Sequence, residues 1–287
     1  MIGSSERVAE TSGFMMAGFR SMAHSLQISG SRLRTELQRR LFHNGRSRPG
    51  FIVGCGRSGT SMLLSHLSKS WQVEPYNEDH PAAFDNYRLK DTGTIAKLVK
   101  TSRAPLSLFK PILSTTTTIR LLSTFPQARF LFVFRHFDDV VKSSMKKFGA
   151  ENRLGHVRSW MEDDFGEFAF APPPEVTRKY LRELWRPNAS AETGAALYWL
   201  FYNRLFFDLD LDQQDRLLLV QYECIVQNPG RSMEDIAKFL GIQFAPSMPE
   251  GIFTASVNHE PANSIDSQVR AECLGLWRRL TGHISPG

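Results

Sequence analysis

A glycine- and serine-rich loop constrains this chain more than any other segment. The apolar run Phe51–Val53 ends at Gly54, the loop Cys55–Gly59 follows, and an apolar pattern with helical spacing begins near Thr60. A strand, a tight loop and a helix in this order direct backbone N–H groups and the positive end of a helix dipole toward one point. Such a point is suited to a phosphate or a sulfate. The loop therefore predicts an anion-binding site.

The loop differs from that of nucleotide kinases in the place of its positive charge. The kinase pattern G-x-x-x-x-G-K-[ST] requires a lysine directly after Gly59, where this chain has Thr60. The fixed positive charge lies inside the loop instead, as Arg57.

Composition sets broader limits. The 287 residues, 41% of them hydrophobic, fit one large domain with an extension. The net charge of +6 suits an anionic ligand, but no basic stripe interleaved with aromatic residues indicates nucleic acid. Three scattered cysteines favour a reducing compartment and match no zinc spacing. Since no transmembrane stretch and no convincing signal peptide is visible, we expect a cytoplasmic protein.

Residues 1–48 have the pattern of an N-terminal helical extension and linker. Ser31–Phe42 carries leucines at helical spacing among basic residues, and Asn44–Gly50 is rich in Gly, Arg, Ser and Pro. We expect a solvated helix packed on the main domain rather than a membrane anchor. The main domain is expected to span residues 49–287, with a helical and aromatic insert near 149–190.

Apolar strands and helices alternate from Phe51 onward. The pattern predicts strands at Phe51–Gly54, Trp71–Glu74, Ala128–Phe134 and Arg216–Tyr222. It predicts helices at Thr60–Ser70, Thr94–Thr101, Ile112–Ser123, Asp138–Phe148, Glu192–Leu209 and Ser232–Leu240. Buried strands separated by helices predict an α/β fold with a central parallel sheet flanked by helices.

A second anion-binding element follows the predicted strand Ala128–Phe134. Arg135 stands at the carboxyl end of that strand, where parallel sheets bind ligands, and Ser143 lies two turns into the next helix. The planar fork of arginine matches phosphate oxygens, and serine adds a short donor.

These elements resemble the sulfotransferases that use 3′-phosphoadenosine 5′-phosphosulfate (PAPS). Arg57–Ser61 is similar to that family's [KR]-S-G-[TS]-[TS] loop, and Arg135 with Ser143 is similar to its R-x7-S element. Val220–Gly230, followed by Phe239–Gly241, resembles its YEDLxxNP segment and closing FLG. The matches follow the family's order over residues 50–242. The style of the motifs is nearer to carbohydrate-directed, tyrosyl-protein-directed and bacterial members than to cytosolic phenol sulfotransferases.

The resemblance implies a P-loop sulfotransferase fold and transfer of a sulfuryl group from PAPS to a hydroxyl or amine, without a required metal. The residues implied in donor binding are Arg57, Ser58, Gly59, Thr60, Ser61, Arg135 and Ser143, and Lys147, one turn after Ser143 on the same helical face, is expected to add a contact. The first five would hold the 5′-phosphosulfate and the last three the 3′-phosphate. Arg57 would also counter the charge on the departing phosphate. Lys110 resembles the family's lysine that contacts the transferred sulfuryl group.

The general base is expected in the acidic stretch after residue 73. Phenol- and steroid-directed members use a histidine two residues after the lysine of K-T-H, and this chain has Ile112 there. In carbohydrate- and tyrosyl-protein-directed members a glutamate follows the loop, and the matching residue is Glu78. Glu74, Asp79 and His80 are the alternatives.

Two other functions and several acceptors stay open. A P-loop small-molecule kinase would need a lysine at Thr60, and an inactive anion-binding scaffold would keep the loop without turnover. The acceptor is a small molecule, a carbohydrate or a lipid. Aromatic residues of the insert either shape its pocket or pack the core: Trp160, Phe165, Phe168, Phe170, Tyr180 and Trp185. Cys55 is a redox-sensitive thiol or, as we favour, a small residue packed in the loop.

Overall fold

The computed structural model describes residues 35, 37–39, 41, 46–166, 171–253, 257 and 261–284. The chain divides into two compact units, Met1–Gly45 and Arg46–Gly287. The described residues of the first unit, 35, 37–39 and 41, are helical and fall within the predicted helix Ser31–Phe42. The rest of that predicted helix lies outside the described residues.

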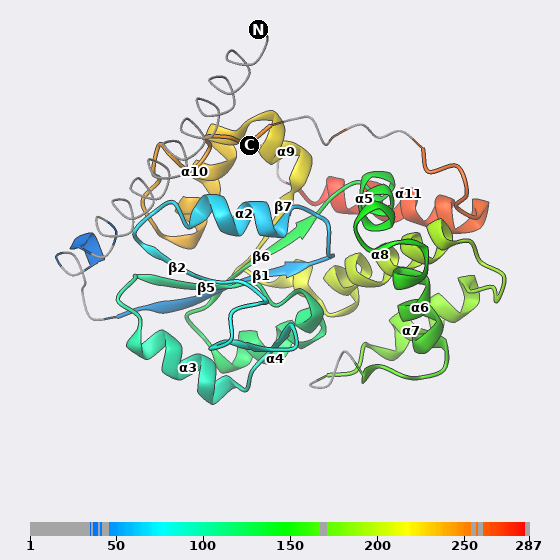
Figure 1. The fold of residues 1–287 in the computed structure, drawn as a ribbon, viewed down its shortest axis with the longest axis horizontal. Helices are drawn as coiled ribbons and strands as arrows, with labels where there is room; N and C mark the ends of the chain where they lie inside the picture. The colour runs from blue at the N-terminus through cyan, green and yellow to red at the C-terminus, as the bar shows by residue number, and fades with distance from the viewer. Residues whose placement is uncertain are drawn as a thin grey trace, which may run out of the picture. The chain divides into compact units, whose positions relative to one another are not determined.

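A five-stranded parallel sheet forms the centre of the second unit (Figure 1). In sheet order the strands are β2 (Val73–Tyr76), β5 (Leu106–Phe109), β1 (Arg48–Gly54), β6 (Arg129–Phe134) and β7 (Leu217–Gln221). All four pairings between these neighbours are parallel. The predicted α/β fold with a central parallel sheet flanked by helices is confirmed.

Helices cover both faces of the sheet. Successive residues of a strand point to opposite sides, so the continuous apolar strands place hydrophobic side chains on both faces. Phe51 and Val53 enter one hydrophobic cluster, while Ile52 between them enters another. The first cluster receives residues from α3 (Thr92–Thr101), α4 (Thr118–Thr124) and α8 (Ala191–Asp208). The second receives residues from α2 (Thr60–Leu67), α9 (Tyr222–Gln227) and α10 (Pro229–Leu240). Figure 1 shows α2 and α10 on one side of the sheet and α3 and α4 on the other.

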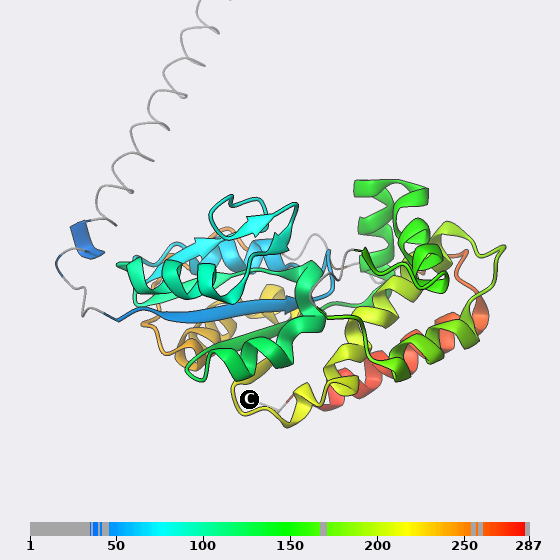
Figure 2. The ribbon, with the colours of Figure 1, turned by 90° about the horizontal axis from the view of Figure 1, so that it is seen from below.

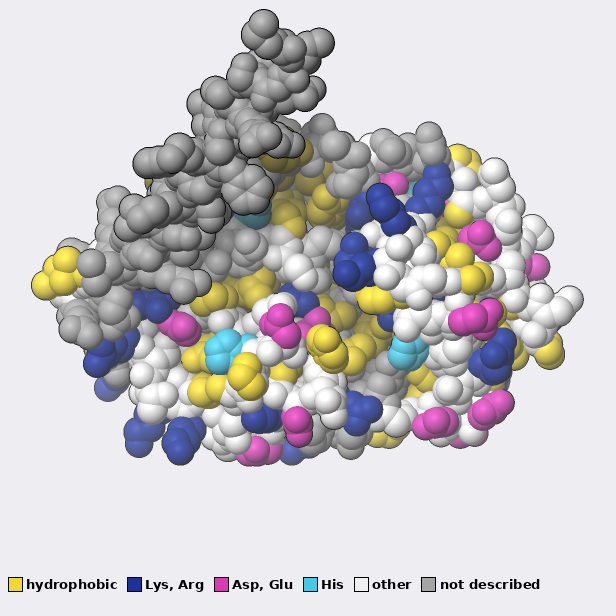
Figure 3. Space-filling view, in the orientation of Figure 1, with side chains coloured by type: hydrophobic (Ala, Val, Ile, Leu, Met, Phe, Trp, Pro, Cys, Tyr) yellow, Lys and Arg dark blue, Asp and Glu magenta, His cyan; other side chains and the backbone are white. Residues whose placement is uncertain are grey.

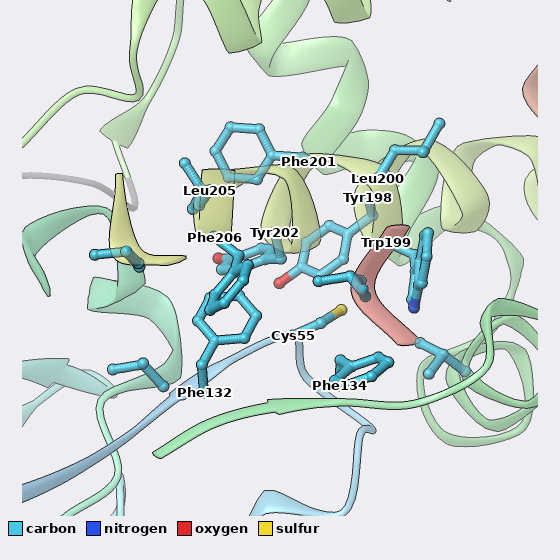
Figure 4. Close-up of a cluster of buried hydrophobic side chains, with 14 of the residues drawn as sticks. Cys55, Phe132, Phe134, Tyr198, Trp199, Leu200, Phe201, Tyr202, Leu205 and Phe206 are labelled. Atoms are coloured by element: carbon cyan, nitrogen blue, oxygen red, sulfur yellow. The ribbon is translucent and has the colours of Figure 1, made fainter. Parts of the chain in front are cut away.

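The aromatic helix α8 forms the centre of a helical layer beside the sheet (Figure 2). It packs against α5 (Phe137–Phe148), α6 (Ala150–Met161), α7 (Glu175–Leu184) and α11 (Ser267–Gly282). Contacts on several sides explain why this helix is apolar nearly all round. Figure 4 shows its aromatic side chains beside Phe132 and Phe134 of β6. Among the described helices, none is both long enough and apolar enough to cross a lipid bilayer.

The first strand begins earlier than predicted. Arg48, Pro49 and Gly50 pair with β5, so they belong to β1 and not to a linker. The Arg48 guanidinium donates a 2.5 Å hydrogen bond to the Gly241 carbonyl beyond α10. The prediction of a linker through Gly50 is therefore wrong, because pairing with β5 holds this Pro- and Gly-containing segment in the sheet.

Other boundaries moved for local reasons. The predicted strand Trp71–Glu74 is displaced to β2, and Tyr222 begins α9 instead of ending β7. The predicted helix Ile112–Ser123 is divided into η1 (Ile112–Thr117), a 3-10 helix, and α4. Hydroxyl groups of Thr115, Thr117 and Thr118 each donate to a carbonyl three residues back, which favours the tighter turn. A hairpin of β3 (Phe84–Asp85) and β4 (Arg88–Leu89) and the short η3 (Leu211–Gln213) had no predicted counterpart.

Gly54 permits a close approach between β1 and β6, and its replacement tests that contact. Its φ is 122°, and a Cβ there would lie 2.3 Å from the Val133 carbonyl oxygen. We predict that Gly54→Ala lowers the free energy of unfolding by about 2–4 kcal/mol, from overpacking and backbone strain. In the control Gly275→Ala, an exposed site in α11 with no atom near the added Cβ, stability should rise by up to about 1 kcal/mol. Urea unfolding measures both, and equal stability of Gly54→Ala and the wild type would contradict the contact.

Candidate active site

Loops at the carboxyl edge of the sheet line a cavity of about 380 Å³. The loop after β1, the segments after β2 and β5, and helices α5, α6 and α8 all contribute to its wall. The charged residues that line it are Arg57, Glu78, Lys110, Lys147 and Arg153. Carboxyl edges of parallel sheets are where such folds bind ligands.

The loop after β1 is held in place by contacts with η1 and α9. The Thr115 hydroxyl lies 3.1 Å from the Gly54 nitrogen and 3.2 Å from the Gly54 carbonyl oxygen. Gly59 has φ 86°, and a Cβ on it would lie 2.2 Å from the ring of Tyr222. Helix α2 then begins at Thr60 without a side-chain cap, and Thr60 and Ser61 line the cavity. The uncapped positive end of α2 therefore faces the cavity.

Arg57 connects the loop to the second predicted anion element. It has φ 69°, and its Nε donates a 3.0 Å hydrogen bond to the Ser143 hydroxyl of α5. Burial, with smaller contributions from the charges of Arg153 and Arg135, lowers the pKa of Arg57 from its ordinary value. Arg57 and Arg153 both line the cavity, and their guanidinium groups lie 6.0 Å and 4.6 Å from the centre of the Phe148 ring.

Arg135 is fixed by contacts with three helices. Its guanidinium lies 4.7 Å from the centre of the Tyr222 ring and 3.5 Å from the Asp139 carboxylate. Its carbonyl accepts a 2.9 Å hydrogen bond from the indole of Trp199, and the next N–H donates to Glu223 at 2.9 Å. Tyr222 and Glu223 at the start of α9 therefore support both Gly59 and Arg135. These two residues belong to the segment that resembles the family's YEDLxxNP motif.

Glu78 and Lys110 face each other across neighbouring strands. Tyr76 and Phe109 are register partners in β2 and β5, so the residues that follow them emerge side by side. The Lys110 ammonium lies 2.5 Å from one Glu78 carboxylate oxygen, and the Ile112 N–H donates to the other at 3.1 Å. Lys110 is buried and Glu78 is partly exposed to the cavity.

The three alternatives to Glu78 lie elsewhere. Glu74 is within β2, opposite Ser107, and does not line the cavity. Asp79 is exposed and accepts a hydrogen bond from Asn77 at 2.8 Å. The ring of His80 packs edge-on against Tyr76, 4.9 Å away, and does not line the cavity either.

Comparison with known proteins identifies the family. Residues 48–264 match the family model described as the sulfotransferase domain. The chain belongs to the sulfotransferase family. The predicted enzyme class is thereby confirmed. A search of curated proteins found no match to this sulfotransferase.

Solved structures similar to this sulfotransferase have low sequence identity. One is a sulfotransferase from Alicyclobacillus acidocaldarius, with 18% identity, a TM-score of 0.46, and coverage of 83% of this chain and 94% of that one. Another is a sulfotransferase domain from the curacin biosynthetic pathway, with 16% identity, a TM-score of 0.48, and coverage of 82% and 98%. A third is a mouse sulfotransferase complexed with PAP, with 14% identity, a TM-score of 0.40, and coverage of 76% and 69%.

The described aromatic residues of the insert pack into the hydrophobic core of the sulfotransferase. Trp160 is fully buried, and the partly buried Phe165, Tyr180 and Trp185 pack against the same cluster. Tyr180 also donates a 2.6 Å hydrogen bond to Glu272. This supports core packing over an aromatic acceptor pocket. Phe168 and Phe170 lie outside the described residues.

Helix α6 supplies polar residues to the cavity that sequence reasoning missed: Asn152, Arg153 and His156. No motif surrounds Arg153, and in sequence it is one of many surface-like arginines. Lysine and arginine side chains, dark blue in Figure 3, also gather over α5, which carries Lys142, Lys146 and Lys147. The described residues contain no group of three or more His, Cys, Asp or Glu side chains placed to hold a metal ion.

Cys55 is a packed residue of the core. It is fully buried beneath α8 (Figure 4), and burial raises the pKa of its thiol to about 12. The thiolate, which is the reactive form, is therefore scarce near neutral pH.

This burial gives a labelling prediction. At about pH 8, iodoacetamide should modify the exposed Cys224 and leave the buried Cys55 and Cys273 unmodified in the folded enzyme. Mass spectrometry of tryptic peptides reads the result, and enzyme unfolded in urea is the control in which all three thiols react. Rapid labelling of Cys55 in the folded state would contradict its burial.

Proposed function

We propose that this sulfotransferase transfers the sulfuryl group of PAPS to a hydroxyl or amine of a small-molecule, carbohydrate or lipid acceptor. The observation that carries the proposal is the placement of Glu78, Lys110 and Arg57 around one cavity. The three free cysteines, Cys55, Cys224 and Cys273, favour a reducing compartment, so the cytoplasm is the proposed location.

The residues around the cavity fit an anionic donor. The uncapped start of α2 offers N–H groups, and Arg57 lies beside them. We assign the 5′-phosphosulfate to Arg57 and the loop from Ser58 to Ser61. We assign the 3′-phosphate to Arg135 and Ser143, with Lys147 as a further contact. The hydrogen bond between Arg57 and Ser143 joins the two sets of residues, which supports their assignment to one ligand.

When bound, the donor supplies an SO₃ group whose bond to the phosphate oxygen breaks as the acceptor oxygen or nitrogen forms a bond to sulfur. Glu78 takes the proton that the acceptor loses, and its carboxylate is oriented for this by Lys110 and the Ile112 N–H. Arg57 offsets the negative charge that the departing phosphate oxygen gains with the bonding electron pair. In this proposal the fixed cations of the chain stabilise that charge without a metal.

A binding experiment tests the donor. At about 100 times its Kd, 3′-phosphoadenosine 5′-phosphate (PAP) should stabilise the wild type by about 2.7 kcal/mol, measured by thermal shift. Arg57→Ala should weaken PAP binding by about 10- to 100-fold, because a charged hydrogen-bond donor is lost. Arg158→Ala, an exposed arginine on α6, is the control and should bind PAP normally. Stabilisation by ATP but not by PAP would favour a kinase and contradict the assignment.

A kinetic experiment tests the base. A screen with sulfur-labelled PAPS first finds an acceptor. With that acceptor, Glu78→Gln should lower kcat by about 10²- to 10⁴-fold, the usual contribution of a general base. The affinity for PAP should stay unchanged.

The neighbouring exposed Asp79→Asn is the matched control and should keep full activity. Normal turnover by Glu78→Gln would exclude Glu78 as the base. PAP binding without transfer to any acceptor by the wild type would instead support an inactive scaffold.

A further inference from the structure

Arg153 is a buried cation that lacks a counter-ion among the described residues. It is 8% exposed, and its Nε has no hydrogen-bond partner in the part of the chain that the structure describes. No carboxylate of that part forms an ion pair with it, whereas Arg135 has Asp139 and Lys110 has Glu78. Burial of an unpaired charge is costly. Such a side chain is suited to an anionic ligand.

The guanidinium is held in one place by two aromatic rings. It lies 3.9 Å from the centre of the Tyr198 ring and 4.6 Å from that of Phe148. Its Nη2 is close to the loop after β1, since a Cβ on Gly56 would lie 3.1 Å away. The side chain lines the same cavity as Glu78. Stacking between rings orients the planar group in advance, so little conformational entropy is lost when it binds.

Among the described residues that line the cavity, the other charged ones already have a partner or an assigned ligand, and Arg153 does not. Glu78 and Lys110 neutralise each other. Arg57 is assigned to the donor by its loop motif, and Lys147 by its place one turn after Ser143 on α5. Arg153 comes from α6, whose wall also includes Asn152 and His156 and holds none of the donor motifs.

Resting on the proposed function, we propose that Arg153 binds an anionic group of the acceptor, a carboxylate, phosphate or sulfate. The enzyme then binds hydroxyl compounds that also carry an anionic group more tightly than similar neutral compounds. Arg153 holds the acidic end of the acceptor while Glu78, on the same cavity, takes the proton from its hydroxyl group. The two residues together set the distance between the charged group and the reacting oxygen.

The test uses the full-length enzyme saturated with PAP. Matched pairs of hydroxyl compounds are titrated by calorimetry: 4-hydroxyphenylacetate with 4-hydroxyphenylacetamide, glucose 6-phosphate with glucose, and 4-hydroxybutyrate with 4-hydroxybutyramide. In at least one pair the wild type should bind the acid about tenfold or more tightly than the neutral compound. Arg153→Met, whose apolar side chain still fills the space between the rings, should lose this preference. Arg158→Met, on the exposed side of α6, should keep it.

Each result bears on the proposal. Equal binding of acid and neutral compound by the wild type in all pairs would overturn it. So would an unchanged preference in folded Arg153→Met, with folding checked by its melting temperature. A loss of PAP affinity in Arg153→Met would assign the residue to the donor and also overturn the proposal. Failure of the proposed function is seen separately, as failure of PAP to bind the wild type.

Discussion

Positively charged side chains gather around the cavity at the carboxyl edge of the sheet, and the proposed function depends on this arrangement of like charges. Burial, Arg153 and Arg135 each lower the pKa of Arg57, in that order. Like charges close together repel each other, and a bound anion offsets this repulsion. In the proposed function, this positive charge serves two anionic ligands: the donor, assigned to Arg57 and Arg135, and the acidic group of the acceptor, assigned to Arg153.

Aromatic side chains, more than carboxylates, hold the charges in place. Tyr222 packs against both Gly59 and the Arg135 guanidinium, while Tyr198 and Phe148 enclose Arg153. Helix α8 contributes twice, since its Trp199 also fixes the carbonyl of Arg135. Rings stabilise a cation without neutralising it, so the charge stays available to a ligand. Aromatic residues of the hydrophobic core therefore also position the arginines of the proposed site.

Sequence predicted the parts of the fold that depend on local pattern. Continuous apolar runs predicted β1 and β6, and the order of glycine, serine and threonine residues predicted the loop between β1 and α2. The start of β1 was misplaced because Pro49 looks like a turn signal until its pairing with Ser107 is known. The short β5 was not identified from its pattern, yet it places Lys110 beside Glu78.

Residues of the site were predictable only where a motif marked them. Glu78 was one of four acidic or histidine residues, and only the register of β2 and β5 distinguishes it in space. Arg153 had no sequence signal, because its burial depends on rings from α5 and α8 that are distant in the chain from one another. Packing between segments that are distant in the chain produces no repeating pattern of residues in the sequence.

The most direct measurement is a crystal structure of the enzyme with PAP. We predict the 5′-phosphate at the loop from Arg57 to Ser61, the 3′-phosphate on Arg135 and Ser143, and Glu78 with Lys110 facing the unfilled part of the cavity. A nucleotide bound elsewhere, or one whose phosphates do not contact Arg57 and Arg135, would contradict it.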